Sequence, residues 1–382
     1  MTASASTARR LWAIEGPAAL ALAAAFGPAP AAFAAPAPSP TREHLLGGSR
    51  YQVGAGAPMQ HALARIDPTS TEVRLAPCGF LPHGWAQNPR LPSRTFFFEK
   101  EGPGAAEFDL VEMRQTRVVP PVRGRTFYGH GAVSADARWL LSTESEPDGR
   151  GVIGVRDAST LAYQGEFPSH GLRPHDCHLI DEGRVLAVAN GGGPSERDPR
   201  PCVCFIEASS GKLLHRHEMA PGLPFNTGHL GPVGRDRALV VSAPQRGLDA
   251  GHPGAVSWCD PRSARLKVLQ PTASAPALLG EALSVAVLPE RDLGLVTHPT
   301  PGWISIWRLS DGSALGGLAV ARVRGLAIAA SRRGLWVSHG ERASLGFLDL
   351  DNPGAGVRVA VEAAMLAGSH LLVQPTPAAG PA

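Results

Sequence analysis

The sequence predicts an all-β protein, a single seven-bladed β-propeller, from three observations. The 382 residues include 44 glycines and 36 prolines, a density that interrupts helices and favours many short strands joined by turns. Similar apolar runs recur every 41 to 55 residues, and periods in the forties are typical of four-stranded propeller blades. Beyond the N-terminal region, no stretch has the pattern of an amphipathic helix that would fit between the turns.

The recurring unit is clearest between residues 126 and 167. A first apolar run, TFYGHGAV, ends in a polar turn at residues 134–138, and a second run, WLLS, follows at once. A third run, GVIGVRD, and a fourth, YQGEF, complete the unit. The same order recurs in the stretch WISIWRLSDGSALGGLAV, where Asp311-Gly312 between two strand-like runs predicts a hairpin. Each unit therefore predicts one four-stranded antiparallel sheet.

Seven such units are present, although the first is incomplete. It covers residues 43–78 and lacks a first strand, whereas the C-terminal run MLAGSHLLVQ, residues 365–374, has strand character and no following partner. We expect this run to return and complete the first blade, because a closed ring leaves no exposed sheet edge. The predicted propeller occupies residues 43–375, followed by a tail at 376–382. The other six units start around His83, His130, His175, His229, Ser284 and Gly325.

The first 34 residues have the features of an export signal. Arg9-Arg10, typical of the twin-arginine route, precedes an apolar run at residues 18–26, and Ala32-Phe33-Ala34 supplies the small residues of a cleavage site. The apolar run is shorter than the roughly 20 residues that span a membrane. We therefore expect cleavage after Ala34, a Pro-rich linker at residues 35–42, a periplasmic mature protein and no membrane span after signal removal.

Charge and cysteine usage exclude several classes of function. The formal net charge is only +3, and no basic stripe is interleaved with aromatic residues, which argues against binding to nucleic acid or to an anionic membrane. The five cysteines include no CxxC spacing, so a disulfide scaffold is not expected. Because their number is odd, at least one thiol is unpaired within the chain.

Four motifs between residues 127 and 192 follow one another in order: FYGHG-x-x-S-x-D, GRGVIGV-x-D, GEFPSHG-x-x-PH and VANGG. Together they resemble the bacterial exported family known as domain of unknown function 1513, over most of residues 45–350. The resemblance implies a propeller of the WD40/YVTN-like superfamily and an association with periplasmic iron-handling partners, such as imelysin-like proteins and haem-containing oxidases. It implies no settled activity. The sequence departs from the family pattern at Asp176, where Glu is frequent, and in a shortened loop at residues 193–199.

Four histidines, His83, His130, His175 and His229, stand at the start of four different units. If each begins the innermost strand of its blade, all four meet at one mouth of the central channel, with Asp176 beside them. Imidazole suits iron, copper or zinc, and a neighbouring carboxylate orients such ligands. Three interpretations remain open: hydrogen bonds between strands and blades, a metal or haem site, and a polar pocket for a small ligand.

Further polar residues are candidates at the same mouth. Glu144, on the predicted loop before Gly149-Arg150-Gly151, is the carboxylate best suited to acid–base chemistry. Arg150 and Arg173 are candidate contacts for an anion. A lactonase-like hydrolase would need carboxylate and amide ligands in the channel, and the suggestive set is Glu144, Asp176 and Asn190.

A second candidate site lies in one predicted hairpin, where the runs 202–204 (CVC) and 215–217 (HRH) fall on adjacent strands. Residues two apart share a face of a strand. If Phe205 faces His215, the cysteines and the histidines point to opposite faces, and a slip of one residue reverses this. We expect opposite faces, because Val203 and Phe205 alternate as a core face does. The alternative is a zinc site of two cysteines and two histidines.

No motif establishes a reaction. The sequence contains no G-x-S-x-G serine, and its glycine-rich runs lack the following helix of a phosphate site. This favours a periplasmic binding or scaffold protein over an enzyme, associated with iron handling as the family resemblance implies. The alternatives are an oxidoreductase that binds iron, copper or haem through the four histidines, and a metal-dependent lactonase-like hydrolase.

Overall fold

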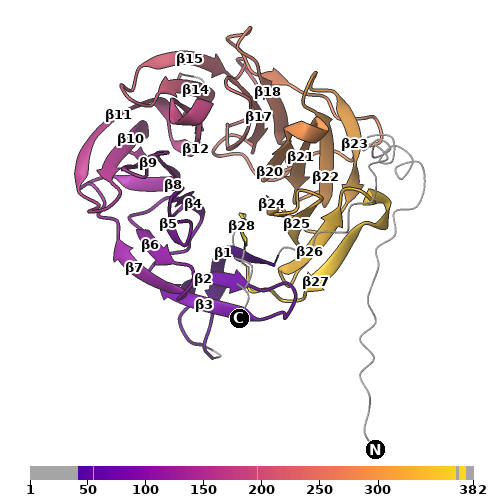
Figure 1. Cartoon of the computed structure of the whole chain (residues 1–382). Coiled ribbons are helices and arrows are strands. Elements are labelled where there is room, and N and C mark those ends of the chain that lie inside the picture. Colours follow the sequence, from indigo (N-terminus) through magenta and orange to yellow (C-terminus); the bar gives the residue numbers. More distant parts are fainter. Residues whose placement is uncertain (1–41, 55, 196, 367–369, 376–382) are drawn as a thin grey trace, which may run out of the picture.

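The described part of the computed structural model, residues 42–54, 56–195, 197–366 and 370–375, forms seven four-stranded antiparallel sheets around one axis (Figure 1). The predicted seven-bladed propeller is confirmed. The predicted signal peptide (1–34), the predicted tail (376–382) and residues 35–41 of the predicted linker lie outside the described residues. No helix among the described residues is long and apolar enough to cross a membrane.

The blades are numbered in chain order, and each blade's strands are given from the channel outward. Blade 1 contains β28 (Leu372–Pro375), β1 (Glu43–Tyr51), β2 (Gln60–Ile66) and β3 (Val73–Cys78). Blade 2 contains β4 (Gly84–Gln87), β5 (Arg94–Phe98), β6 (Ala105–Asp109) and β7 (Arg114–Val118). Blade 3 contains β8 (Thr126–Val133), β9 (Trp139–Ser145), β10 (Arg150–Asp157) and β11 (Tyr163–Leu172). Blade 4 contains β12 (Pro174–Ile180), β13 (Val185–Asn190), β14 (Cys202–Glu207) and β15 (Leu213–Glu218).

The remaining blades repeat this arrangement. Blade 5 contains β16 (His229–Val233), β17 (Arg237–Ser242), β18 (Ala255–Cys259) and β19 (Lys267–Val268). Blade 6 contains β20 (Val285–Leu288), β21 (Leu293–His298), β22 (Trp303–Arg308) and β23 (Ala314–Ala319). Blade 7 contains β24 (Leu326–Ile328), β25 (Gly334–His339), β26 (Ser344–Asp349) and β27 (Val357–Val361). Three short 3₁₀ helices occur in connections among the described residues: η1 (Asp181–Gly183), η2 (Pro289–Arg291) and η3 (Pro353–Ala355).

The ring closes in blade 1, as the sequence predicts. The C-terminal strand β28 pairs antiparallel with β1, in a register that runs from Glu43 opposite Pro375 to Leu46 opposite Leu372. Figure 1 shows β28 reaching the channel beside the first strands of the chain. The two ends of the propeller are therefore joined in one sheet, and the innermost place in blade 1 is filled by the last strand.

The hydrophobic core is divided among the contacts between blades. The buried apolar residues form seven clusters, and each cluster joins two neighbouring blades. In β5, Phe97 packs toward blade 1, whereas Phe96 and Phe98 pack toward blade 3. Because both faces of a central strand are covered, these strands are continuously apolar rather than alternating.

The seven innermost strands line a central cavity of about 530 Å³. Most of its wall is apolar and includes Val133, Leu179, Val287 and Ile328, each from a different strand. The histidines that precede or begin these strands lie at one end of the cavity.

Candidate metal centre

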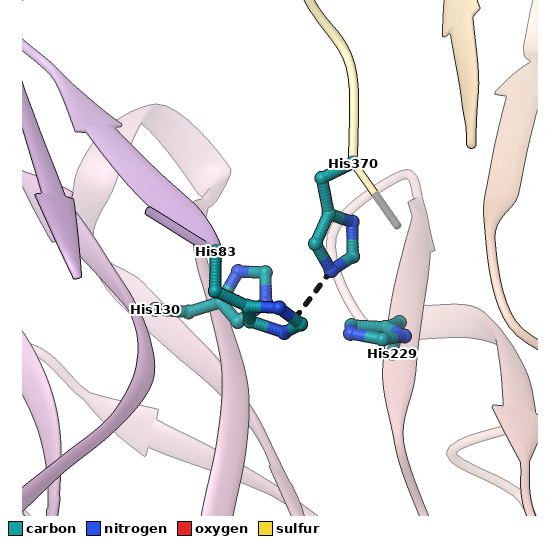
Figure 2. A group of neighbouring side chains, drawn as sticks. All are labelled: His83, His130, His229 and His370. Carbon is teal, nitrogen blue, oxygen red and sulfur yellow. Dashed lines mark hydrogen bonds between the residues drawn. The ribbon is translucent and has the colours of Figure 1, made fainter. Parts of the chain in front are cut away.

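The structure brings the four predicted histidines together on the propeller axis, and a fifth, His370, joins them. The five side chains come from separate blades, because His370 directly precedes β28 of blade 1. The exposed fraction of each residue is only 7 to 9%, so the cluster is buried. Figure 2 shows four of them, His83, His130, His229 and His370, pointing toward one another. We call these four and His175 the histidine cluster.

Bulges and glycines allow this close approach. The pairing of β8 with β9 slips between Phe127 and Gly131, and the bulge turns His130 into the channel. Within it Gly129 has a φ of 112°, a backbone conformation that side chains rarely tolerate. A Cβ atom on Gly129 would lie 3.0 Å from the ring of His83 and 3.2 Å from that of His175. The FYGHG motif therefore supplies both a cluster member and the space for two others.

A second glycine has the same role on the neighbouring blade. A Cβ atom on Gly84 would lie 2.5 Å from the Nδ1 atom of His130 and 2.5 Å from the carbonyl oxygen of Gly129. The pairing of β12 with β13 is also irregular between Pro174 and Asp176, which places a bulge at His175. These local features explain why the histidines at equivalent points of different blades can touch.

The outward-facing nitrogens of two imidazoles donate to carbonyl oxygens, and that of a third lies beside a carboxylate. Nδ1 of His175 donates to the carbonyl oxygen of Tyr128 at 3.1 Å, and Nδ1 of His229 donates to that of Leu283 at 2.7 Å. Nδ1 of His130 lies 3.1 Å from Oδ1 of Asp176. A carbonyl oxygen only accepts, so the proton of the neutral ring is on Nδ1 and the Nε2 atom has a free lone pair.

The Nε2 atoms face one another at the centre of the cluster. Nε2 of His83 lies 3.3 Å from Nε2 of His175 and 3.3 Å from Nε2 of His370, the contact drawn in Figure 2. Nε2 of His130 and Nε2 of His229 are buried and have no hydrogen-bond partner among the described residues. Other buried polar atoms of the described residues also lack partners, for example Nε2 of His217 and Oε2 of Glu144, but only in the histidine cluster do several ring nitrogens converge on one point. This convergence is what fits a cation at the centre.

The electrostatic surroundings keep the cluster neutral. Burial, followed by repulsion from the neighbouring imidazoles, lowers the pKa of His83, His175 and His370 well below the ordinary value. Burial lowers the pKa of His229 to about 3. Burial also lowers the pKa of His130, although the Asp176 carboxylate works in the opposite direction. Neutral imidazole is the form that binds metal ions.

Asp176 is the carboxylate that supports the cluster. It is buried, with 2% of its surface exposed, and Oδ2 accepts hydrogen bonds from the backbone N–H of Leu230 at 2.9 Å and from Nε2 of His178 at 3.0 Å. Burial would raise its pKa, but His178 and His130 hold the pKa of Asp176 well below the usual range. His178 is half-exposed and borders the central cavity. Asp176 thus orients His130 from behind, as carboxylates do for histidine ligands of metals.

The geometry fits a bare transition-metal ion. One nitrogen atom each from His83, His130, His229 and His370 lies within 4.8 Å of the other three, the only such group of potential ligands found among the described residues. At the usual metal–nitrogen distance of about 2.0 to 2.1 Å, ligand nitrogens in a tetrahedral site are about 3.4 Å apart. The contact of 3.3 Å between Nε2 of His83 and Nε2 of His370 matches that separation.

A haem group does not fit the histidine cluster. Haem iron takes protein ligands only on the two opposite faces of the macrocycle. Nε2 of His83 is 3.3 Å from two other Nε2 atoms, which leaves no space for a porphyrin ring among them.

The other predicted channel residues do not line the cavity. Glu144 is on strand β9 rather than on a loop, and it is buried in an ion pair whose Oε1 atom is 2.6 Å from Nη1 of Arg156. The loop prediction was wrong because the polar run around Glu144 is buried together with its own countercharge. The lactonase-like set therefore does not converge.

The remaining candidates hold neighbouring segments together. Arg150 is exposed, and Nη1 of Arg173 donates to the carbonyl oxygen of Gly192 at 2.9 Å, which ties two loops together. Oδ1 of Asn190 in blade 4 accepts from the hydroxyl of Ser169 in blade 3 at 2.6 Å.

The cysteine and histidine pairs of blade 4 lie on opposite faces, as predicted. Phe205 is opposite His215 and Cys204 is opposite Arg216 in the pairing of β14 with β15. The sulfur atoms of Cys202 and Cys204 are 3.8 Å apart and buried, and both residues pack in the core between blades 3 and 4. The alternative zinc site of two cysteines and two histidines is therefore not formed.

Sequence reasoning missed two members of the site. His370 lies within the run that was expected to close blade 1, and closure puts it at the same inner place as the other four histidines. Aligning that run with the start of the other units is the signal that would have identified it. His178 is two residues after Asp176 on β12, and residues two apart lie on the same face of a strand. This spacing is the signal that would have identified His178.

Comparisons with known proteins identify the family and support the fold, but they indicate no activity. A family model described as "Protein of unknown function (DUF1513)" matches residues 81–366. No curated protein matches the chain. Among solved structures, the chain is similar to a chain of hydrazine synthase from Kuenenia stuttgartiensis, with 10% sequence identity, a TM-score of 0.58 and coverage of 83% of this chain and 99% of that chain. At this identity the likeness shows a shared fold alone.

Proposed function

Because the chain belongs to the family DUF1513, described only as proteins of unknown function, we propose a function from the site itself: the protein binds one transition-metal ion in the histidine cluster. The observation that carries this proposal is the set of buried Nε2 lone pairs that face one another. Nδ1 of His175 and Nδ1 of His229 already donate to carbonyl oxygens, and Nδ1 of His130 lies 3.1 Å from Oδ1 of Asp176. Nε2 of His130 and Nε2 of His229 have no hydrogen-bond partner among the described residues. A metal cation satisfies all of them at once.

The donor set favours iron, copper or zinc. Imidazole nitrogen is a ligand of intermediate softness, whereas magnesium and calcium prefer oxygen ligands. The cysteines are not near enough to contribute, because no thiol belongs to the group of converging ligands found in the described part of the chain. Among divalent ions at one nitrogen site, copper binds most tightly by the Irving–Williams order. The family's association with iron handling makes Fe(II) the second ion to test.

In this proposal the propeller is a rigid metal-binding platform. The four converging ligands, His83, His130, His229 and His370, come from different blades, so the bound ion connects blades 1, 2, 3 and 5 across the axis. A redox role for the bound ion, the alternative function, is favoured by one observation: the cavity of about 530 Å³ reaches three of the five histidines.

Metal titration of the purified metal-free protein tests the proposal. We expect one equivalent of Cu(II) or Zn(II) per chain by calorimetry and elemental analysis, and one equivalent of Fe(II) under anaerobic conditions. The double variant His130→Ala/His229→Ala removes two ligands and should abolish stoichiometric binding. His215→Ala is the matched control, because His215 is an exposed histidine on the outer strand β15. Equal binding by the two variants, or no stoichiometric binding by the parent protein, would contradict the proposal.

A further inference from the structure

The ring of innermost positions contains two places without an imidazole. The backbone N–H of His130 donates to the hydroxyl of Thr143 at 3.2 Å, in the second strand of its blade. In blade 6 the N–H of Ser284 donates to the hydroxyl of Thr297 at 3.0 Å, and in blade 7 the N–H of Gly325 donates to that of Ser338 at 2.8 Å. These shared hydrogen bonds show that Ser284 and Gly325 occupy the histidine position in their blades.

The two places are neighbours, so they form one sector of the ring. Blades 6 and 7 lie between blade 5, which carries His229, and blade 1, which carries His370. Five side chains can reach the metal from the rest of the ring, whereas glycine and serine leave space on this side. The coordination shell therefore has an asymmetric arrangement, crowded on one side and bounded by small residues on the other.

The central cavity reaches the cluster beside this sector. Its wall includes Ser284 together with His130, His229 and His370. Oγ of Ser284 accepts a hydrogen bond from the backbone N–H of Leu326 at 3.1 Å. The Ser284 hydroxyl donates no hydrogen bond to another described residue, so its proton is available to a molecule in the cavity.

Charge decides which kind of molecule fits. Five neutral imidazoles leave the charge of a bound dication uncompensated. The nearby buried carboxylate is Asp176, whose single negative charge is shared with His178. At least one positive charge thus remains in a buried site, and an uncompensated buried charge is strongly unfavourable. The apolar wall around Val285, Leu326 and Ile328 limits the size of a partner that must shed its water.

We propose that the bound metal ion has one coordination position open toward Ser284 and the cavity, and that this position takes a small monoanion. In the resting protein this ligand is hydroxide from a metal-bound water. The inference rests on the proposed metal binding and adds the ligand class and the side of approach. Ser284 donates its hydroxyl proton to the bound anion, and Val285 sets the width of the passage next to the metal.

Azide binding to the Cu(II)-loaded protein tests the inference. We expect a saturable azide-to-copper charge-transfer absorption with one azide per copper and a change in the electron paramagnetic resonance spectrum. Ser284→Ala should weaken azide binding by about tenfold or more, because it removes a hydrogen bond to a charged ligand. Val285→Phe should block azide while copper still binds. Ser313→Ala, in the outer hairpin of the same blade, is the matched control.

Each outcome has a distinct meaning. A copper-loaded protein whose spectra do not respond to azide would show a closed coordination shell and overturn the inference, while metal binding itself would stand. Azide affinity unchanged in both Ser284→Ala and Val285→Phe would also overturn it, because the anion would then approach from another side. Failure of the parent protein to bind copper would remove the proposed function, and the inference with it.

Discussion

Two groups of buried polar side chains lie close together in the sequence and follow opposite rules. In blade 3, Glu144 and Arg156 are each about 1% exposed, and Oε1 of Glu144 is 2.6 Å from Nη1 of Arg156. Nη1 of Arg156 also donates to Ser142, and Nη2 donates to the carbonyl oxygen of Pro120. This pair balances its own charge within one blade.

The histidine cluster is assembled between blades and lacks such a balance. Nδ1 of His175 and Nδ1 of His229 donate to carbonyl oxygens, whereas Nε2 of His83 contacts only Nε2 of His175 and of His370. Nε2 of His130 and Nε2 of His229 have no hydrogen-bond partner among the described residues. The difference teaches how to separate structural from functional burial in this molecule. Oε2 of Glu144 and Nε of Arg156 also lack a hydrogen-bond partner among the described residues, so a lack of partners alone does not separate the two groups. A buried charge whose countercharge is supplied by the chain stabilises the fold, whereas neutral ring nitrogens that converge on one point indicate a ligand that the chain does not supply.

The largest expected effect is the acid sensitivity of the metal-free protein. Four histidines, His83, His175, His229 and His370, have folded-state pKa values far below the unfolded value of about 6.5. Below pH 6.5 these histidines therefore bind protons in the unfolded chain but stay neutral in the folded protein. Stability is complete above pH 6.5 and is lost as the pH falls below 6.5. Between pH 8 and pH 5.5 each histidine accounts for roughly 1 to 2 kcal/mol, and the four together for up to about 6 kcal/mol.

Urea unfolding in a chelator at the two pH values measures this loss. The double variant His83→Gln/His175→Gln should lose less than the parent protein, by about 3 kcal/mol, because two proton-binding groups are removed. An unfolding free energy that does not change between pH 8 and pH 5.5 would show that the imidazoles are accessible to protons in the folded protein.

The next largest effect is expected from breaking the ion pair. Glu144→Ala leaves the Arg156 guanidinium buried without its carboxylate, which should lower the free energy of unfolding by about 3 to 5 kcal/mol. Metal affinity should not change, because Glu144 does not border the cavity. Urea unfolding and copper titration of the same sample measure both quantities. The double change Glu144→Leu/Arg156→Met is the control and should recover most of the lost stability. Loss of copper binding in Glu144→Ala would show that the ion pair also supports the metal site, contrary to the prediction.

Removing a single imidazole should have the opposite effect from breaking the ion pair: metal affinity should fall, whereas stability at acid pH should be affected less. His83→Ala is expected to weaken metal binding by more than about 100-fold, since His83 is central to the cluster and touches His175 and His370. The metal-free protein should also become less sensitive to acid, because the variant has one fewer histidine that takes up a proton on unfolding. Copper titration and urea unfolding at pH 5.5 report the two changes. Weaker unfolding stability at both pH values with unaltered copper affinity would assign His83 a structural role.

Much of the fold follows from local signals in the sequence. The turns, the Asp-Gly hairpin at residues 311–312 and the recurring inner runs each act over a few residues, and a ring of equivalent units brings their starts to one axis. The meeting of His83, His130, His175 and His229 was predictable for that reason. His370 was not identified, because its place depends on the pairing of β28 with β1, the two ends of the propeller.

The error at Glu144 has a different physical origin. The run STESEP is polar, and polar runs next to glycine are typical of loops. The burial of Glu144 depends on Arg156 from the adjacent strand β10, and on Arg125, whose Nη1 atom is 3.8 Å from Oε2 of Glu144. Such pairing joins residues from different segments, so no single stretch of sequence indicates it.

The smallest effect is expected from changing the support behind a ligand rather than the ligand. Asp176→Asn retains a carbonyl oxygen that can accept from the Leu230 N–H, but it removes the charge that faces Nδ1 of His130. Metal affinity should fall by about 10- to 100-fold, or about 1.4 to 2.7 kcal/mol, while a single metal ion still binds. Asp176→Glu restores the charge and should recover part of the affinity, a rescue that a purely structural carboxylate would not show. Competitive titration of Zn(II) against a chelator measures the three proteins, with Arg150→Ala, an exposed residue, as the control. If the Asn variant binds zinc as tightly as the parent protein, Asp176 belongs with Glu144 among the charges that serve only the fold.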